Sequence, residues 1–326
     1  MTRAVTRDDV KEALFDNGED KAPGPDGFSS GFFKAAWPVI GDEVTATIQD
    51  FFNSGKLLKQ INCTLLSLIP KVASPNVVGD FSPIACCNVI YKVITKIIVQ
   101  RMQLVMSKIV SPSQMAFVPG RRISSNILLA QELFSGYNQR DLPPRCALKV
   151  DLRKAYDTIE WDFVIASLTL FGFPSTLVAW VEKCISSATF AVSLNGELHG
   201  FFKGARGLRQ GDPMSPYLFV LAMEVLHLLL LQRVKQFGDF CYHRHCEDRS
   251  FFHTFAKWSG HEANVHKSQL IVSKSALAIK PLLLATLGFQ ESVLPVRYLG
   301  LPLISSRLTI RDCAPLIRKV DERLKG

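Results

Sequence analysis

The sequence predicts an α+β fold, in which antiparallel strands pack against amphipathic helices. Apolar and polar side chains alternate over residues 146–152, which is the period of a strand with one face on a core. Residues 189–202 form two strand-like runs around Asn195-Gly196, the strongest hairpin signal in the chain. Residues 88–110 and 214–231 have instead the length and apolar content of helices.

The composition is that of a folded globular chain. It has 326 residues, 48% of them hydrophobic and 21% charged, so two or three subdomains are expected. The net charge of +9 favours a polyanionic partner such as nucleic acid. The eight cysteines are scattered, mostly in apolar runs, and predict buried thiols of a reducing compartment. The N-terminus has no signal-peptide pattern, so we expect an intracellular protein, nuclear or cytoplasmic.

Local signals predict the other elements in order. Thr6 caps a short helix that ends at Phe15, and residues 32–52 are helical with interruptions at Pro38 and Gly41. Residues 65–71 form a short buried strand with a lysine at its end. The polar side of the helix at 88–110 is expected to carry four cations: Lys92, Lys96, Arg101 and Lys108. The chain then continues with a loop (114–122), two helices (163–171 and 175–185), a glycine-rich basic loop (204–213) and a final amphipathic helix (311–325).

Residues 214–231 form the most apolar run in the chain. The run falls slightly short of the roughly 20 residues of a spanning helix, and Glu224 near its middle would be costly in lipid. Ser215 and Pro216 provide a helix cap and a first-turn proline. We therefore predict a buried core helix and no membrane-spanning segment.

Asp151 is the main candidate for chemistry, because it ends the strand at 146–152 on its open face. Tyr156 follows in the next turn. A carboxylate at a strand end, with an aromatic ring nearby, suits a divalent metal held beside a sugar-phosphate. The alternative is a solvated aspartate that caps the next helix, and these residues alone leave both interpretations open.

Eight segments together resemble, in their order along the chain, the reverse transcriptase domain of non-LTR (LINE-type) retrotransposons. The first palm motif of that family is similar to residues 150–157, and the second to residues 207–216. The other similar segments are the opening signature (21–27), the fingers lysine strand (68–71), the fingers helix and the block after it (83–92 and 114–122), the fourth motif (264–268) and the fifth (298–303).

This resemblance implies a right-hand polymerase fold with an antiparallel palm sheet packed on helices. Residues 1–140 would form the fingers, 141–280 the palm, and 281–326 the end of the palm and the start of a truncated thumb. The implied reaction is attack of a DNA primer 3′-OH on the α-phosphate of a deoxynucleotide, directed by an RNA template. Two Mg²⁺ ions would activate the nucleophile and stabilise the leaving oxygen.

The resemblance also assigns a role to each matched residue. Asp151 would bind both metal ions, helped by the carbonyl of Leu152, and Tyr156 would press on the sugar and exclude a 2′-OH. The remaining nucleotide-binding residues would be Arg209, Gln210 and Gly211, which touch the nucleotide and template, and Lys71 and Lys267, which lie near the triphosphate.

The third palm motif, a strand turn with two adjacent aspartates, is missing between residues 231 and 264. The sole Asp-Asp of the chain is Asp8-Asp9, in the first helix. Glu247-Asp248 has polar and basic neighbours and no apolar strand after it, so we predict that it is no substitute. A lone carboxylate cannot hold two Mg²⁺ ions together. We therefore predict that the motif is deleted near residues 248–255, that Mg²⁺ binding is impaired and that the domain is catalytically inactive.

Other observations add to this prediction or compete with it. Ser82 precedes Pro83-Ile84 where the family has a phosphate-clamping arginine. Loss of the catalytic hairpin would leave the strand at 146–152 with an unpaired edge and an uncovered apolar face. One alternative function is a non-catalytic nucleic-acid-binding remnant. Another is a zinc module, although the spacing of its candidate ligands fits no common finger: Cys241, His243, His245, Cys246 and His253.

Overall fold

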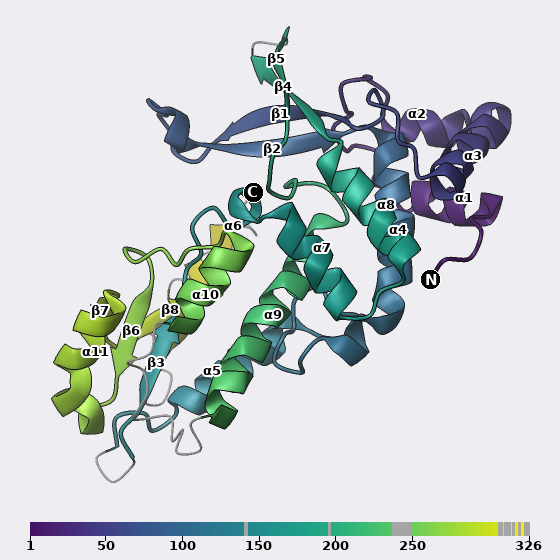
Figure 1. Ribbon diagram of the computed structural model, residues 1–326. Coiled ribbons are helices and arrows are strands. Elements are labelled where there is room, and N and C mark those ends of the chain that lie inside the picture. The colour runs from purple at the N-terminus through teal and green to yellow at the C-terminus, as the bar shows by residue number, and fades with distance from the viewer. Residues whose placement is uncertain are drawn as a thin grey trace. The chain divides into compact units, whose positions relative to one another are not determined.

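The protein has the expected mixture of helices and strands, as the computed structural model in Figure 1 shows. The structure describes residues 1–139, 143–194, 197–236 and 250–305, with a few single residues beyond 305. These residues form two compact units. The first unit comprises residues 1–111, 154–225 and 258–260, and the second comprises 112–153, 226–257 and 261–326.

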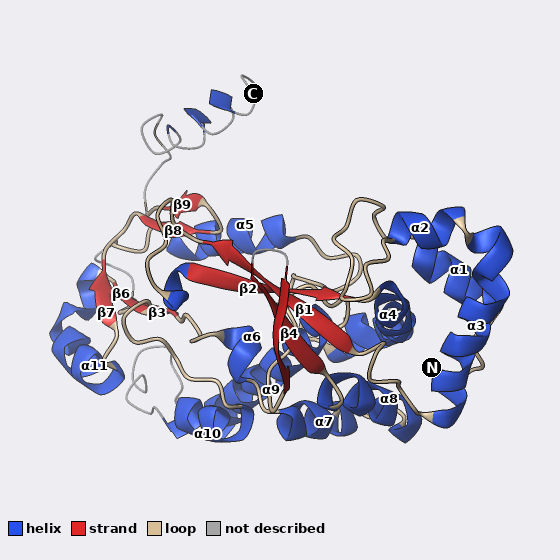
Figure 2. Ribbon diagram, turned by 90° about the horizontal axis from the view of Figure 1, so that it is seen from above, coloured by secondary structure: helices blue, strands red, loops and turns tan. Residues whose placement is uncertain are grey.

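Three helices open the first unit and lie side by side in both views (Figures 1 and 2). Helix α1 (Arg7–Phe15) is capped as predicted, because Thr6 Oγ1 accepts from Asp9 N and Asp9 Oδ2 accepts from Thr6 N. The helices α2 (Ser30–Ala35) and α3 (Trp37–Ser54) follow. The expected interruptions at Pro38 and Gly41 are wrong, since the break lies at Ala36 and Pro38 occupies the first turn of α3, where its missing N–H costs nothing.

A four-stranded sheet forms the centre of the first unit, in the order β2-β1-β4-β5. Its strands are β1 (Cys63–Pro70), β2 (Phe81–Cys87), β4 (Thr189–Leu194) and β5 (Glu197–Lys203). Strands β1 and β2 are antiparallel, joined through the 3-10 turn η1 (Val78–Asp80), whereas β1 and β4 are parallel. The predicted hairpin strands β4 and β5 are confirmed, although their Asn195-Gly196 turn lies outside the described residues. Strand β1 is half-buried and its last two residues are exposed, so the expectation of a buried strand is wrong.

Helices α4 (Val89–Ile109), α6 (Ala155–Thr158), α7 (Trp161–Leu170) and α8 (Ser175–Ser186) complete most of the first unit. Arg101 on α4 was expected on a solvated face, and this is wrong. The side chain is buried, and its guanidinium lies 5.2 Å from the Phe52 ring centroid and 5.5 Å from that of Trp180. Its Nη2 also donates to the carbonyl of Arg3 at 2.8 Å, so Arg101 joins three segments of the unit.

Helix α9 (Ser215–Gln236) contains the most apolar run of the chain. By length and composition alone, residues 215–233 could cross a membrane, with a mean hydropathy of 1.5. Several of its side chains are nevertheless buried within the protein, among them Leu218 and Leu221, and Glu224 is only 5% exposed. This burial favours the predicted core helix.

The second unit contains a three-stranded sheet in the order β3-β6-β7. Strand β3 (Cys146–Lys149) is antiparallel to β6 (Gln269–Val272), and β6 is parallel to β7 (Gln290–Ser292). The other elements are α5 (Ile123–Phe134), α10 (Ser250–Ser259), η2 (Lys274–Ile279), α11 (Lys280–Leu287) and the β8–β9 hairpin (Val296–Tyr298 and Leu301–Leu303). Among the described residues β3 is the end strand of its sheet. The helix expected at 311–325 lies almost wholly outside them.

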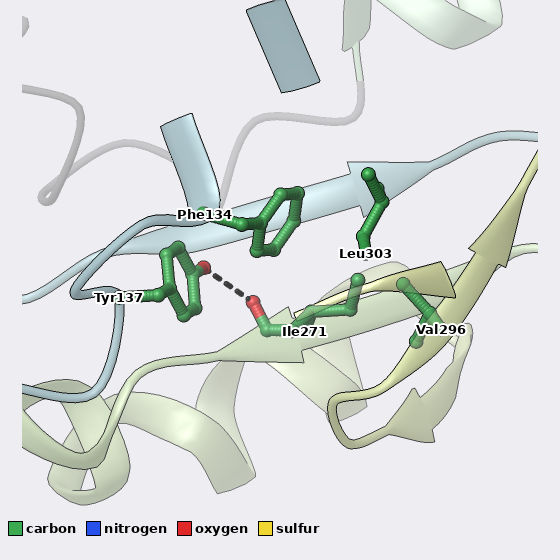
Figure 3. Packing of buried hydrophobic residues seen from close by; sticks show 5 residues of the cluster. All are labelled: Phe134, Tyr137, Ile271, Val296 and Leu303. Carbon is green, nitrogen blue, oxygen red and sulfur yellow. Dashed lines mark hydrogen bonds between the residues drawn. The ribbon is translucent and has the colours of Figure 1, made fainter. Parts of the chain in front are cut away.

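Apolar clusters cover both faces of the β3–β6 pair. One cluster, drawn in Figure 3, contains Phe134, Tyr137, Ile271, Val296 and Leu303, and Tyr137 Oη donates to the Ile271 carbonyl at 3.0 Å. The other contains Leu270, Leu283, Leu287 and Phe289, against which Cys146, Leu148 and Val150 pack. The expected uncovered apolar face on residues 146–152 is therefore wrong, because η2, α11 and the residues after them cover it.

Candidate nucleotide and nucleic-acid site

Asp151 lies exposed just beyond the end of β3, and backbone hydrogen bonds hold its position. Its N–H donates to Ser268 Oγ at 3.0 Å, and its carbonyl accepts from Asn264 N at 2.7 Å. The alternative role as a helix cap is wrong, because α6 begins after Lys154 and receives no side-chain hydrogen bond at its N-terminus. The Asp151 carboxylate is thus exposed at the surface, while hydrogen bonds to Asn264 and Ser268 hold its backbone N–H and carbonyl in place.

Lys267 belongs to the turn that holds Asp151. The backbone N–H groups of Lys267 and Ser268 donate to the Asn264 carbonyl at 3.1 and 2.8 Å, and the Lys267 side chain is exposed. Leu152 forms an isolated antiparallel bridge with Ala263, at the start of the same turn. The structure therefore brings Asp151, Leu152 and Lys267 together within the second unit.

The described residues do not fit the two-metal site that the resemblance implies. Mg²⁺ needs oxygen ligands in near-octahedral geometry, and two ions held together need several carboxylates. Among the residues described, no three His, Cys, Asp or Glu side chains converge in a way that could hold a metal. Glu247-Asp248 and four candidate zinc ligands, Cys241, His243, His245 and Cys246, lie outside the described residues, whereas His253 lies on α10 with an exposed side chain.

The first unit holds Tyr156 next to the glycine-rich loop at 204–213. Leu208 N donates to the Tyr156 carbonyl at 2.6 Å, Gly207 N to the Ile159 carbonyl at 2.8 Å, and Trp161 Nε1 to the Gly207 carbonyl at 2.7 Å. The Tyr156 ring stacks on Phe219 of α9, with 5.3 Å between centroids, and burial raises the pKa of its hydroxyl. The segments at 150–157 and 207–216 are thus in direct contact through Tyr156 and Leu208.

The same loop is also attached to β2. Ala85 N donates to the Gln210 carbonyl at 2.8 Å, and Gly211 has a φ of 116°. A Cβ on Gly211 would lie 2.6 Å from the Ala85 carbonyl oxygen, so the close approach of loop and strand requires glycine. Tyr156, Arg209 and Gln210 consequently line one pocket of about 270 Å³ in the first unit.

Arg209 is buried within the protein, with an exposed fraction of 7%. Its Nη1 donates to Asn62 Oδ1 at 2.8 Å and to Thr64 Oγ1 at 3.0 Å, and its Nη2 donates to the Cys184 carbonyl at 2.8 Å and to the Tyr91 hydroxyl. Because the guanidinium N–H groups of Arg209 already donate to these protein groups, a nucleotide in the pocket would contact other parts of the loop than the Arg209 side chain.

Asp212 and Tyr91 complete this buried network, and no motif in the sequence marks them for that role. Tyr91 Oη donates to Asp212 Oδ2 at 2.7 Å, and Asp212 Oδ1 accepts from Met214 N at 2.9 Å. Burial raises the pKa of the Tyr91 hydroxyl and of the Cys184 thiol, which keeps both groups neutral. The network joins β1, α4, α8 and the loop, and it fixes the backbone that presents Gln210 and Gly211.

Lys71 lies in the first unit but does not line the pocket. It follows the end of β1, where its N–H donates to the Asp80 carbonyl at 2.7 Å and its Nζ donates to the Gly79 carbonyl at 3.1 Å. The side chain is exposed at this turn between β1 and β2. The structure thus brings Tyr156, Arg209, Gln210 and Gly211 together, whereas Lys71 is not among the residues that line their pocket.

Asn88 fastens the loop at residues 21–27 to the rest of the first unit. Its Oδ1 accepts from Asp26 N at 3.3 Å, and its Nδ2 donates to the Gln60 carbonyl at 2.7 Å. Gly24 packs so closely here that a Cβ would lie 2.0 Å from Asn88 Oδ1. This loop is therefore a packed structural segment, with its backbone attached to the start of α4.

The chain has a mixed α+β fold, and comparison with known proteins identifies it as a polymerase-type domain. Residues 69–303 match the family described as reverse transcriptase (RNA-dependent DNA polymerase). The match spans well over half of the 326 residues, so the chain belongs to this family.

Similar proteins come from transposable elements. The Transposon TX1 uncharacterized 149 kDa protein of Xenopus laevis is 29% identical over 230 residues, which cover 71% of this chain and 18% of that protein. The Retrovirus-related Pol polyprotein from type-2 retrotransposable element R2DM of Drosophila melanogaster is 25% identical, covering 68% of this chain and 20% of its own length. The chain thus spans about a fifth of these relatives, and the predicted resemblance to non-LTR retrotransposon proteins is confirmed.

Proposed function

We propose that this reverse transcriptase domain binds an RNA template and a DNA primer but does not extend the primer. The observation that carries the proposal is the isolation of Asp151, the sole aspartate of the implied metal set that the sequence retains. No Asp-Asp pair occurs between α9 and the turn at 264–268, and the described residues near Asp151 provide no further carboxylate cluster. When bound, two divalent cations supply activation of the primer 3′-OH and stabilisation of the leaving oxygen.

The other parts of the family's machinery support binding. We propose residues 1–140 as fingers, 141–280 as a palm without its catalytic hairpin, and 281–326 as the palm end and the start of a thumb. Tyr156 would contact a nucleotide sugar, and Gln210 and Gly211 would contact the base or template. The exposed Lys71 and Lys267 would attract phosphates. RNA templates and deoxynucleotides occur inside cells, so we propose an intracellular location, nuclear or cytoplasmic.

Primer extension tests the absence of catalysis. With oligo(dT) annealed to poly(rA), deoxythymidine triphosphate and Mg²⁺, we expect no product above the protein-free reaction. A retroviral reverse transcriptase assayed in parallel controls for the substrate. Robust synthesis by this chain that Asp151→Ala abolishes would overturn the proposal.

Salt dependence tests the binding. The net charge of +9 favours phosphate contacts, each of which releases condensed counterions. We expect the affinity for an RNA–DNA hybrid to fall steeply and log-linearly with salt, by roughly 0.7–0.9 in log K per log salt for each contact. Absent or salt-independent binding would contradict both the proposal and the alternative of a non-catalytic binding remnant.

A further inference from the structure

The exposed strand β5 contributes an aromatic ring to the lining of the pocket beside the loop at 204–213. Phe202 pairs with Phe190 across the β4–β5 ladder, and their rings stack at 23° with 5.6 Å between centroids. Phe190 also packs closely against Gly204, since a Cβ on Gly204 would lie 2.9 Å from its ring. Phe202 is 48% exposed, so part of its ring remains open to a ligand.

We propose that Phe202 is a further base-stacking residue, which forms one wall of this pocket, an inference that rests on the proposed nucleic-acid binding. The volume of about 270 Å³ is below the roughly 300–1,000 Å³ of sites that take drug-sized ligands, and it suits a single base or nucleoside. Aromatic side chains on an exposed strand stack bases of any sequence, because every base has a π-face.

The lining has the chemistry that a base requires. Leu66, Pro83 and Ala85 of β1 and β2 contribute an apolar surface. Gln210 and Asp157 also line the pocket and can hydrogen-bond the polar edge of a base. The apolar surface therefore suits the flat faces of the base, and the polar groups suit its edge.

Two cationic residues of the lining suit a polynucleotide backbone. Lys203 and Arg206 both line the pocket. Arg206 is paired with Glu160 at 3.2 Å, so Lys203 is the cation more available to a phosphate. The base in the pocket could belong to an unpaired template nucleotide or to an incoming deoxynucleotide. Tyr156 lines the same pocket and would be next to either of them.

A matched control lies next to Phe202 in the chain. Phe201 is 69% exposed but does not line the pocket, as expected for consecutive residues of a strand, which point to opposite faces. Removal of either ring deletes a similar exposed apolar surface from β5. A loss confined to Phe202→Ala therefore reports the pocket rather than the strand.

Fluorescence anisotropy with three labelled primer–templates tests the site. One hybrid has no overhang, one has a single-stranded template overhang, and one has an overhang of the same length and charge built from abasic residues. For the wild-type chain we expect the base-containing overhang to bind about fivefold or more tightly than the abasic one, the lower end of base–aromatic stacking. Phe202→Ala should abolish this difference, Phe202→Trp should restore it and Phe201→Ala should leave it unchanged.

The outcomes separate this inference from the proposed function. If the chain binds none of the three hybrids, the proposed function fails. If it binds all three equally, or if Phe201→Ala loses as much as Phe202→Ala, the nucleobase site alone is overturned. Sedimentation of the free chain is a further check, because a dimer that Phe202→Ala dissociates would mean that β5 instead pairs with a second copy.

A competition experiment identifies the source of the base. A free deoxynucleotide that removes the overhang-dependent gain supports a pocket occupied by the incoming nucleotide. Insensitivity of the gain to a deoxynucleotide supports occupation by the unpaired template base. Both results uphold the nucleobase site, provided that Phe202→Ala removes the response.

Discussion

The guanidinium of Arg209 lies 4.0 Å from the ring centroid of Tyr91 and donates a hydrogen bond to the hydroxyl of the same residue. The two residues are separated by more than a hundred positions in the chain, and both are buried. Because Tyr91 also donates to Asp212, the contact fixes the loop that carries Gln210 and Gly211 onto α4.

Substitution of Arg209 should destabilise the first unit. Arg209→Met leaves the Asp212 carboxylate buried without its guanidinium partner, and loss of one member of a buried pair costs about 3–5 kcal/mol. Chemical unfolding followed by tryptophan fluorescence measures this loss. The matched change Arg206→Met breaks the exposed pair with Glu160 and should cost less than about 1 kcal/mol. Equal effects of the two substitutions would contradict the structural role of Arg209.

Gly211→Ala should also destabilise the loop, through both space and backbone conformation. The φ of 116° is strained for alanine, and the new Cβ would meet the Ala85 carbonyl at 2.6 Å. Gly55→Ala isolates the conformational part, because Gly55 has a φ of 68° and open space around it. We expect about 1–2 kcal/mol for Gly55→Ala and a larger loss for Gly211→Ala. A smaller loss at position 211 would show that the loop does not press on β2.

Stability of the second unit should fall as the pH drops below 6.5. Burial lowers the pKa of His261 to about 4, so the unfolded chain takes up a proton between pH 6.5 and pH 4 that the folded chain does not. The free energy of unfolding therefore decreases across this window, by about 2 kcal/mol once partial solvent screening is allowed for. Urea unfolding at a series of pH values measures the slope. His261→Phe keeps the ring packed near Phe255 and should flatten it, and an unchanged slope would assign the effect to other groups.

Magnesium should leave the unfolding temperature nearly unchanged. A ligand stabilises a folded protein by RT ln(1 + [L]/Kd), which is only a few tenths of a kcal/mol when [L] is at or below Kd. Asp151 is exposed, and no group of three possible ligands occurs among the described residues, so about 10 mM Mg²⁺ and EDTA should give the same thermal transition within error. A rise with Mg²⁺ that Asp151→Asn removes would reveal additional ligands.

The sequence predicts the local elements of this protein better than the contacts between distant segments. The alternation at 146–152 and the Asn195-Gly196 signal correctly predict β3 and the β4–β5 strands, because period and turn chemistry act over a few residues. The parallel β1–β4 pair joins residues more than a hundred positions apart, and no local pattern encodes such a partner.

The candidate site shows the same division. Asp151 is presented at an exposed strand end as its alternation indicates, and the motif order brings Tyr156 and Gln210 to one pocket. The burial of Arg209 could not be read from the sequence, because its partners come from three other elements. Phe202 also gave no signal, since an aromatic residue in a strand is most often part of a core.

The close contact between Gly24 and Asn88 sets a limit on natural variation. The backbone of Gly24 does not have a positive φ, so the restriction comes from space alone: any larger residue must displace the Asn88 side chain and break its bonds to both Asp26 and Gln60. In a saturation library sorted for folded protein, codon 24 should accept almost nothing else, although it lies in a connecting segment. A shorter residue at position 88 should not open that codon to alanine, because the new Cβ would still lie 2.4 Å from the backbone nitrogen of residue 88.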